Sequence, residues 1–257
     1  MKVAIFPSCI VDTVFPEAGA AAIRLLERLG IEVDFPLEQT CCGQMHLNTG
    51  YETRAKKLAA RHLANFTPYD WVVGISTSCT TAVREYYPQL LGPTRAEVGG
   101  RAKFIELSEF LLDVLGVTEL QGTFAKKVTF HTSCHSLRGI HLGDRPQRLL
   151  GMLSGIQLVP LPKSDSCCGF GGTFSIKNSA ISTVMMEEKL ANVYWTGAEV
   201  LTAADSSCLM NLSGGIQAAK KPLTVMHMQK YSKSLLGRHK GSYLTFRGRS
   251  EHGFWQA

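Results

Sequence analysis

The sequence predicts an α/β fold of two duplicated, Rossmann-like βαβ modules with parallel sheets, related by a pseudo-twofold axis. Three observations predict it: an internal repeat, an alternation of β-rich and helical segments within each repeat, and the same cysteine pattern in both halves. Strands that alternate with helices form parallel sheets through right-handed crossovers. The 257 residues suffice for a first module at 1–122, a second at 123–229 and a basic tail at 230–257.

Each half is expected to start with a strand that ends at a single cysteine. The run KVAIFPSC ends at Cys9, and the similar run KVTFHTSC ends at Cys134. A helix is expected next, because residues 24–26 and 148–150 share the sequence Arg-Leu-Leu. A glycine follows shortly afterwards in both halves and would end that helix.

Two further strands and a helix complete each repeat. The expected second strands, IEVDFP and IQLVPLP, lead to the cysteine pairs 41–42 and 167–168. A helix is predicted over residues 53–65 in the first half and over 176–193 in the second. The third strands, WVVGIST and AEVLTAA, then lead to the last cysteine of each half.

All eight cysteines of the chain belong to this repeat. They are Cys9, Cys41, Cys42 and Cys79 in the first half, and Cys134, Cys167, Cys168 and Cys208 in the second. Ligands of parallel sheets gather outside the carboxyl ends of the strands, so we expect the four thiols of each half to converge on one rim. Helix N-termini at that rim would favour the thiolate form.

The composition favours a protein with a buried core and reduced thiols. Hydrophobic residues make up 45% of the chain, which is enough for a core without disulfide bonds. We expect no membrane span and no cleaved signal, because the apolar run at the start is short and enters a strand directly. A cytoplasmic location follows, where thiols stay reduced, and structural disulfides are therefore disfavoured.

The net charge of +6 is concentrated at the C-terminus. Six basic residues and one acid follow Gln229, so the tail carries +5 and the rest of the chain +1. A nearly neutral body argues against a nucleic-acid-binding protein. We expect the tail to be a solvated end.

Four thiolates in each half suit either an iron–sulfur cluster or a tetrahedral zinc ion. Structural zinc sites usually draw on compact Cys-x-x-Cys motifs, whereas Cys9 and Cys79 enclose most of a module. The adjacent Cys41 and Cys42 would be strained on one small ion, yet they could reach two irons of a cluster. A cluster in each half is therefore preferred, and zinc in one half is the alternative.

Glycines after the second cysteine pair support the cluster interpretation. Gly169, Gly171 and Gly172 would let backbone N–H groups approach inorganic sulfur. The sequence contains neither the glycine spacing of a dinucleotide-binding motif nor a P-loop. The closely spaced cysteines of bacterial ferredoxins are also missing from it.

Three histidines lie close to cysteines in the sequence: His46, His131 and His135. Each could donate a hydrogen bond to a ligand, serve as an alternative ligand or transfer a proton. His135 is the candidate for a catalytic role because it directly follows Cys134.

Several motifs resemble the lactate-utilization protein A family, small proteins made of two cysteine-rich CCG domains. They are CCGFGGTFS at 167–175, DSSCLMN at 205–211 and NTGY at 48–51, and the similarity covers residues 1–228. Related domains occur in heterodisulfide reductases and in the glycolate oxidase iron–sulfur subunit. Ser76 and Asp205 stand where the fuller CCG pattern has a further cysteine, so an oxygen ligand from either residue stays open.

The resemblance implies an iron–sulfur subunit of an oxidoreductase system that converts L-lactate to pyruvate. It implies electron acceptance or relay through clusters of the 4Fe-4S type, one per half, held by the eight cysteines. The implied partners are other iron–sulfur proteins of that system, with a small 2-hydroxy acid as the substrate of the complex. The alternatives are a heterodisulfide or thiol–disulfide reductase and a zinc-stabilised, non-catalytic scaffold for redox partners.

Overall fold

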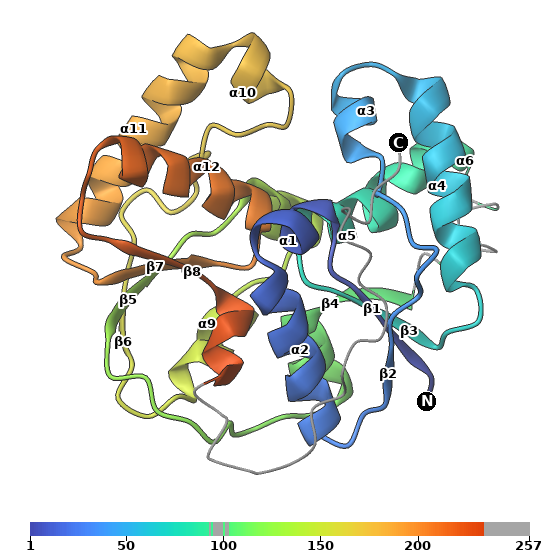
Figure 1. Cartoon of the computed structure of the whole chain (residues 1–257), viewed down its shortest axis with the longest axis horizontal. Coiled ribbons are helices and arrows are strands. Elements are labelled where there is room, and N and C mark those ends of the chain that lie inside the picture. The colour runs from blue at the N-terminus through green and yellow to red at the C-terminus, as the bar shows by residue number, and fades with distance from the viewer. Residues whose placement is uncertain (93, 95–99, 101–102, 234–257) are drawn as a thin grey trace.

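Two four-stranded parallel sheets form the framework of the computed structural model, which describes residues 1–92, 94, 100 and 103–233 (Figure 1). The first sheet has the order β2-β1-β3-β4, with β1 at Val3–Phe6, β2 at Val33–Asp34, β3 at Trp71–Gly74 and β4 at Phe104–Glu106. The second has the order β6-β5-β7-β8, with β5 at Lys127–Phe130, β6 at Gln157–Val159, β7 at Val200–Ala203 and β8 at Thr224–His227. The equivalent strand orders confirm the predicted duplicated α/β fold.

The central strands are short apolar runs that are buried on both faces. Every residue of β1 and of β7 is buried, as expected for parallel strands covered by helices on both sides. Val3 pairs with Trp71 across β1 and β3, and Val128 pairs with Val200 across β5 and β7. The fourth strand of each sheet was not predicted, because β4 and β8 are only three and four residues long and lack a cysteine at their ends.

The helices of the first half follow the strands in the expected alternation. They are α1 (Cys9–Val14), α2 (Pro16–Arg28), α3 (Gln44–Asn48), α4 (Glu52–Phe66), α5 (Thr77–Thr81), the π-helical η1 (Ala82–Tyr86), α6 (Tyr87–Leu91), α8 (Leu107–Glu109) and the π-helical η3 (Phe110–Val114). The helix predicted over 53–65 is α4. Its buried residues, among them Ala55, Ala59 and Leu63, recur at helical spacing on one face.

The second half repeats this alternation with shorter helices near its start. They are the π-helical η4 (His135–Gly139), α9 (Arg145–Gly151), α10 (Phe174–Lys177), α11 (Ser179–Trp195), α12 (Ser206–Ala218) and the 3-10 helix η5 (Met228–Lys233). The helix predicted over 176–193 is two helices. Asn178 separates α10 from α11, because its backbone leaves the helical region with φ −127° and ψ 47°.

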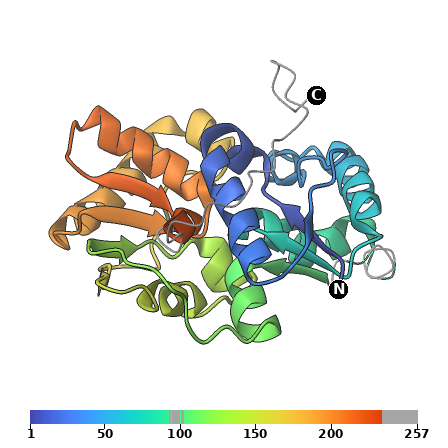
Figure 2. The same cartoon turned by 60° about the horizontal axis from the view of Figure 1, so that its bottom comes forward.

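One hydrophobic core is shared by the two halves. Leu25 and Leu26 of α2 and Phe110 of η3 pack in the same cluster as Phe130 and Leu149 of the second half. Separate clusters cover the opposite faces, under α4 and α6 in the first sheet and under α11 and α12 in the second. Figure 2 shows the two sheets side by side with α2 between them. The halves are therefore joined by apolar packing, which fixes the relative positions of their rims.

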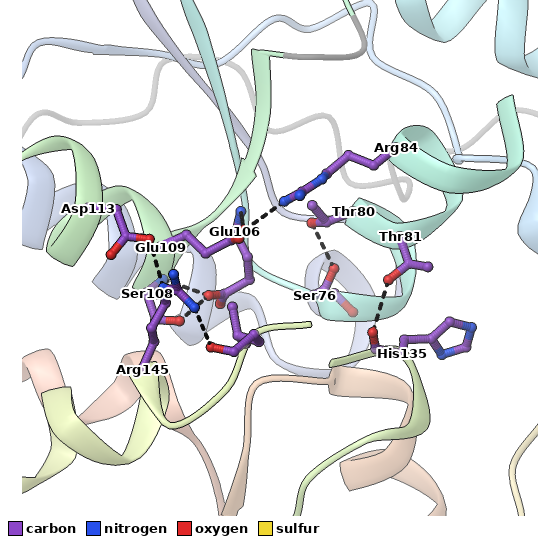
Figure 3. Close-up of polar contacts among 11 residues, drawn as sticks. Ser76, Thr80, Thr81, Arg84, Glu106, Ser108, Glu109, Asp113, His135 and Arg145 are labelled. Carbon is purple, nitrogen blue, oxygen red and sulfur yellow. Dashed lines mark hydrogen bonds and ion pairs between the residues drawn. The ribbon is translucent and has the colours of Figure 1, made fainter. Parts of the chain in front are cut away.

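Polar contacts also cross between the halves near the end of β4 (Figure 3). Arg145 at the start of α9 donates from Nε to Asp113 Oδ2 of η3 at 2.7 Å. On the first module, Arg84 and Glu109 form an ion pair at 2.9 Å. Glu106 and Glu109 close a capping box at the start of α8: Glu109 Oε2 accepts from the Glu106 N–H at 3.2 Å, and Glu106 Oε2 accepts from the Ser108 N–H at 2.6 Å.

The end of the described chain packs back onto the first half. Helix η5 contacts α2, and Lys230 Nζ lies 2.8 Å from Glu17 Oε2. The predicted boundary at residue 230 thus falls inside η5, and the rest of the predicted basic tail, 234–257, lies outside the described residues. Among the residues that the structure describes, no helix is both long and apolar enough to cross a membrane.

Candidate metal centres

The structure brings the four cysteines of the first half together at the carboxyl end of the first sheet. Cys9 starts α1 directly after β1, the pair 41–42 precedes α3, and Cys79 lies in the first turns of α5. Cys9 Sγ lies 4.0 Å from Cys41 Sγ. The thiols of Cys41 and Cys79 lie close enough to Cys42 to raise its pKa, so the four thiols form one continuous group. We call this group the first centre.

The second centre has the same arrangement in the second half. It consists of Cys134, Cys167, Cys168 and Cys208. Cys134 and Cys167 interact closely enough to shift each other's pKa, as do Cys167 and Cys168, and Cys168 Sγ lies 3.0 Å from Cys208 Sγ. Both centres are formed from three distant segments that meet because parallel strands deliver them to one rim.

A backbone N–H stabilises the first cysteine of each pair as a thiolate. Gly43 N donates to Cys41 Sγ at 3.4 Å, and Gly169 N donates to Cys167 Sγ at 3.3 Å. Both glycines have positive φ angles, 80° and 86°. A Cβ on Gly169 would lie 2.5 Å from the carbonyl oxygen of Ser182, so a side chain is excluded there. The Cys-Cys-Gly motif is therefore a turn that points an N–H group at sulfur.

The thiols within each centre differ in their protonation. Hydrogen bonds from Cys42 and Cys9, with the Gly43 N–H, lower the pKa of Cys41 to about 2. Hydrogen bonds from Cys134 and Cys168 lower the pKa of Cys167 to about 2. The donating thiols have raised pKa values, since each loses its hydrogen bond and adds a like charge when it ionises. Metal binding must displace those protons, which makes affinity depend on pH.

His131 lies against the second centre and is fully buried. One of its ring nitrogens and the sulfurs of Cys168 and Cys208 all lie within 4.8 Å of one another. Among the described residues, neither ring nitrogen of His131 has a hydrogen-bond partner. Burial, followed by the charge of Lys189, lowers its pKa to about 4, so the ring is neutral at physiological pH. The equivalent residue of the first half is Phe6, so the first centre has no imidazole at this position.

His135, the catalytic candidate, lies between the two centres. Its Nδ1 is 3.7 Å from Cys134 Sγ, and its Nε2 is 2.7 Å from Gln44 Nε2 of α3. Thr81 Oγ1 of α5 donates to the His135 carbonyl at 3.4 Å (Figure 3). The ring thus connects the turn after the first cysteine pair to a cysteine of the second centre. Sequence spacing indicated the contact with Cys134 but not the contact with Gln44.

Asp205 caps two helices, one from each half. Its Oδ1 accepts hydrogen bonds from the N–H groups of Ser207 at 3.0 Å and Cys208 at 3.4 Å, at the start of α12. Its Oδ2 accepts from Thr77 Oγ1 at 2.7 Å and from Ser78 N at 2.8 Å, at the start of α5. Both carboxylate oxygens are therefore engaged by the helices that carry the last cysteine of each centre.

Ser76, the other candidate oxygen ligand, lies at the same junction. Its hydroxyl accepts a hydrogen bond from Ser206 Oγ at 3.1 Å, and its carbonyl accepts from Thr80 Oγ1 at 3.1 Å (Figure 3). Thr77 N donates to the carbonyl of Ala204 at 3.1 Å. The segments before the last cysteines thus hold the two halves together. An aspartate or serine directly before a helix is an ordinary N-cap signal, which would have indicated this role from the sequence.

The glycines after the second pair bring the two halves into close contact. Gly171 and Gly172 have φ angles of 56° and 69°, and a Cβ on Gly172 would lie 3.0 Å from Met45 Sδ of α3. Thr173 Oγ1 lies 3.0 Å from Thr49 Oγ1, just after the same helix. Figure 1 shows α3 and α10 on the same side of the molecule, one from each half. Gly171 and Gly172 therefore lie at the contact between the modules, whereas the Gly169 N–H is directed at Cys167 Sγ.

Lys189 is a buried cation near the second centre that the sequence did not single out. It lies in α11, and its Nζ donates to the carbonyls of Lys163 at 2.7 Å and Ser164 at 3.3 Å. Burial lowers the pKa of Lys189 below its ordinary value, and the nearby thiols of the second centre offset part of that shift. A lysine that directly follows two glutamates in a helix carries no sequence signal for burial. Its charge would stabilise a group with excess negative charge, such as a thiolate-ligated metal.

The donor set of each centre suits an iron–sulfur cluster or another thiophilic metal. Sulfur ligands from four cysteines, partial burial and N–H groups directed at sulfur are the features by which proteins hold such groups. Among the described residues, the first centre groups four thiols, and the second groups four thiols with the imidazole of His131.

Comparison with known proteins gives two matches to one family model, described as a Cysteine-rich domain and named CCG, at residues 3–84 and 128–213. The chain is 44% identical to lactate utilization protein A of Bacillus subtilis over 238 residues, which cover 91% of this chain and all of the relative. It is also 44% identical to lactate utilization protein A of an Exiguobacterium species, over 88% of this chain and 95% of the relative.

Among solved structures, a hypothetical protein from Helicobacter pylori has a similar fold. The TM-score is 0.64 at 11% sequence identity, over 93% of this chain and half of that protein. This similarity supports the α/β architecture.

Proposed function

Because the chain belongs to the lactate utilization protein A family and carries two cysteine-rich CCG domains, we propose that it is an iron–sulfur subunit of a system that oxidises L-lactate to pyruvate. The observation that carries the proposal is the gathering of all eight cysteines into two four-thiol centres.

In this proposal the eight cysteines hold one cluster per centre, of the 4Fe-4S type. When bound, such clusters supply reversible one-electron transfer. The residues of the chain bind and position them: Gly43 and Gly169 direct N–H groups at sulfur, which stabilises negative charge there. Cys42 and Cys168 are buried in the apolar clusters beneath α4 and α11, which limits access of water.

The subunit would accept or relay electrons rather than bind the hydride acceptor itself. Oxidation of L-lactate to pyruvate releases two electrons and two protons, and the sequence has no dinucleotide-binding motif. We therefore propose that other iron–sulfur proteins of the same system are its partners, and that the complex acts in the cytoplasm, where the thiols stay reduced. The 2-hydroxy acid is the substrate of that complex.

Metal analysis of protein purified without oxygen tests the proposal. We expect iron and acid-labile sulfide in a ratio near one, a brown colour and an absorption band that bleaches on reduction. Mixing with partner proteins and L-lactate should bleach the same band, whereas D-lactate or no substrate serves as control. Stoichiometric zinc without iron in both centres would instead favour a structural scaffold. A cluster that turns over a small disulfide but does not respond to lactate would favour a reductase.

A further inference from the structure

The two centres differ at one buried position, and that difference points to a mixed ligand set in the second. Strand β5 and the residues after it align with β1 without a gap, so His131 is equivalent to Phe6. Both side chains are 1% exposed. We propose that His131, in place of one of the four thiolates, is a direct ligand of the metal group in the second centre, which would then be held by one imidazole and three thiolates. The first centre would be held by sulfur alone. This inference rests on the proposed metal-binding function.

The strand geometry directs His131 toward the cysteines. Its backbone N–H donates to the Thr202 carbonyl at 2.8 Å, so pairing with β7 continues one residue past β5. Side chains alternate between the faces of a strand. Phe130 packs in the core shared by both halves, and His131 therefore points to the opposite face. That face is covered by α11 and α12 and contains Cys168 and Cys208.

The spacing of the three donor atoms suits a common metal. They lie within 4.8 Å of one another. Ligand atoms at 2.0–2.3 Å from a tetrahedral ion are separated by about 3.3–3.8 Å, so small movements would place His131, Cys168 and Cys208 on one zinc ion. Wider spacing would place them on different irons of a cluster. Either Cys134 or Cys167 can complete the set, because both belong to the same thiol group.

The unpaired state of the imidazole is the second, independent observation. A buried ring without hydrogen bonds loses the hydration of both nitrogens and gains nothing in return. His131 is in this state among the described residues, and a metal would satisfy one nitrogen. The first centre offers a contrast. Its neighbouring imidazole, His62, keeps one hydrogen bond: Nδ1 donates to the Thr40 carbonyl at 3.2 Å, while Nε2 has no partner among the described residues. The ring packs against Phe6 with ring centroids 4.5 Å apart.

A chemical consequence follows for the proposed clusters. Replacing a thiolate by a neutral imidazole removes one negative charge from the ligand set, which raises the reduction potential of the cluster it holds. The second centre would then be reduced before the first.

The test uses the full chain labelled with ¹⁵N-histidine and loaded with metal without oxygen. If the second centre contains iron, pulsed electron paramagnetic resonance should show a directly bonded histidine nitrogen. If it contains zinc, X-ray absorption at the zinc edge should show imidazole scattering. His131→Phe copies the first half, and either signal should vanish in it. The metal affinity of the second centre should fall at least 10-fold, because removing only a hydrogen-bond partner of a ligand already costs about 10-fold.

Two further variants keep the test decisive. His131→Cys restores a ligand and should retain the metal, lose the nitrogen signal and lower the potential of the second centre. His227→Phe replaces a histidine that is also fully buried in the second sheet and should leave the nitrogen signal intact. If wild-type protein holds metal in both centres but shows no histidine nitrogen, the inference is wrong while the proposed function stands. If neither centre binds metal, both fail.

Discussion

Gln44 Nε2 lies 2.7 Å from His135 Nε2 and so joins the turn of the first centre to the residue beside Cys134 of the second. The amide nitrogen of Gln44 can only donate, so Nε2 of His135 accepts and its Nδ1 carries the proton. That proton is directed toward Cys134, whose Sγ lies 3.7 Å from Nδ1. The glutamine of one half therefore fixes the tautomer of an imidazole that faces a cysteine of the other half.

Replacing Gln44 with alanine should loosen this link. We expect Gln44→Ala to lower the free energy of unfolding of metal-free protein by about 1 kcal/mol, the typical net contribution of one hydrogen bond. The ¹⁵N shifts of the His135 ring should show a mixture of tautomers instead of one. Gln89→Ala is the matched control, because Gln89 is exposed and bonds only within its own helix turn. Equal shifts in both variants would mean that Gln44 does not set the tautomer.

Asp205 is expected to be the most sensitive polar position at the junction of the halves. Its carboxylate accepts hydrogen bonds from the starts of α5 and α12. An asparagine would keep one acceptor and turn a donating NH₂ toward N–H groups that need an acceptor. We expect Asp205→Asn to cost about 2–4 kcal/mol, since a helix cap contributes roughly 1–2 kcal/mol and two are damaged.

Urea unfolding of metal-free protein measures that cost. Asp144→Asn is the control, since Asp144 occupies the N-cap of α9 without a side-chain cap bond. If the two variants lose the same stability, Asp205 does not join the halves as described.

The fold was predictable because the repeat fixes it. Two segments with the same order of strand, helix and cysteine can only be two similar parallel βαβ units. The carboxyl ends of parallel strands meet at one edge of the sheet, so cysteines that follow the strands lie together there. The contacts across the halves were not predictable. Gln44 and Gly172 meet their partners only because apolar packing of α2 sets the distance between the modules, and no local pattern encodes that distance.

The difference between the two centres is partly visible in the sequence. His131 is a candidate ligand there because it precedes Cys134 by three residues, but its burial and lack of partners required coordinates. Asp205 and Ser76 are candidate oxygen ligands because each replaces a cysteine. In the structure their oxygens are engaged by helix starts and hydroxyl groups. The burial of Lys189 has no signal in the sequence at all.

Replacing Cys168 should affect one centre only. Cys168→Ser removes a buried sulfur that contacts both Cys167 and Cys208, so the second centre should lose its metal. The first centre should keep its own, because its four thiols belong to the other sheet. Iron and sulfide content should fall by about half. Cys42→Ser should give the same loss, with the first centre empty and the second centre loaded. Loss of all metal in either variant would show that the centres are not independent.

The glycine of the second Cys-Cys-Gly turn should not tolerate a side chain. In Gly169→Ala the new methyl group would meet the Ser182 carbonyl, and a φ of 86° is unfavourable for alanine. We expect a loss of at least about 2 kcal/mol in thermal or urea unfolding, together with weaker metal binding. Gly214→Ala is the control: Gly214 lies in α12 with open space around it, so alanine should stabilise the helix by about 1 kcal/mol. A neutral Gly169→Ala would contradict the description of this turn.

Glu106 should make the stability depend on pH. Burial is the main cause that raises its pKa from 4.5 to about 7, against the hydrogen bonds from Ser108. The folded protein therefore binds a proton between pH 4.5 and 7 that the unfolded chain releases, and stability from this group falls as the pH rises through that window. Glu106→Gln should remove this slope, so that its stability relative to wild type improves by about 1–3 kcal/mol from pH 5 to pH 8. Urea unfolding across this range measures the effect, and Glu119→Gln, at an exposed position, controls for loss of one carboxylate. Parallel pH profiles for wild type and Glu106→Gln would show that the pKa of Glu106 is not raised at the start of α8.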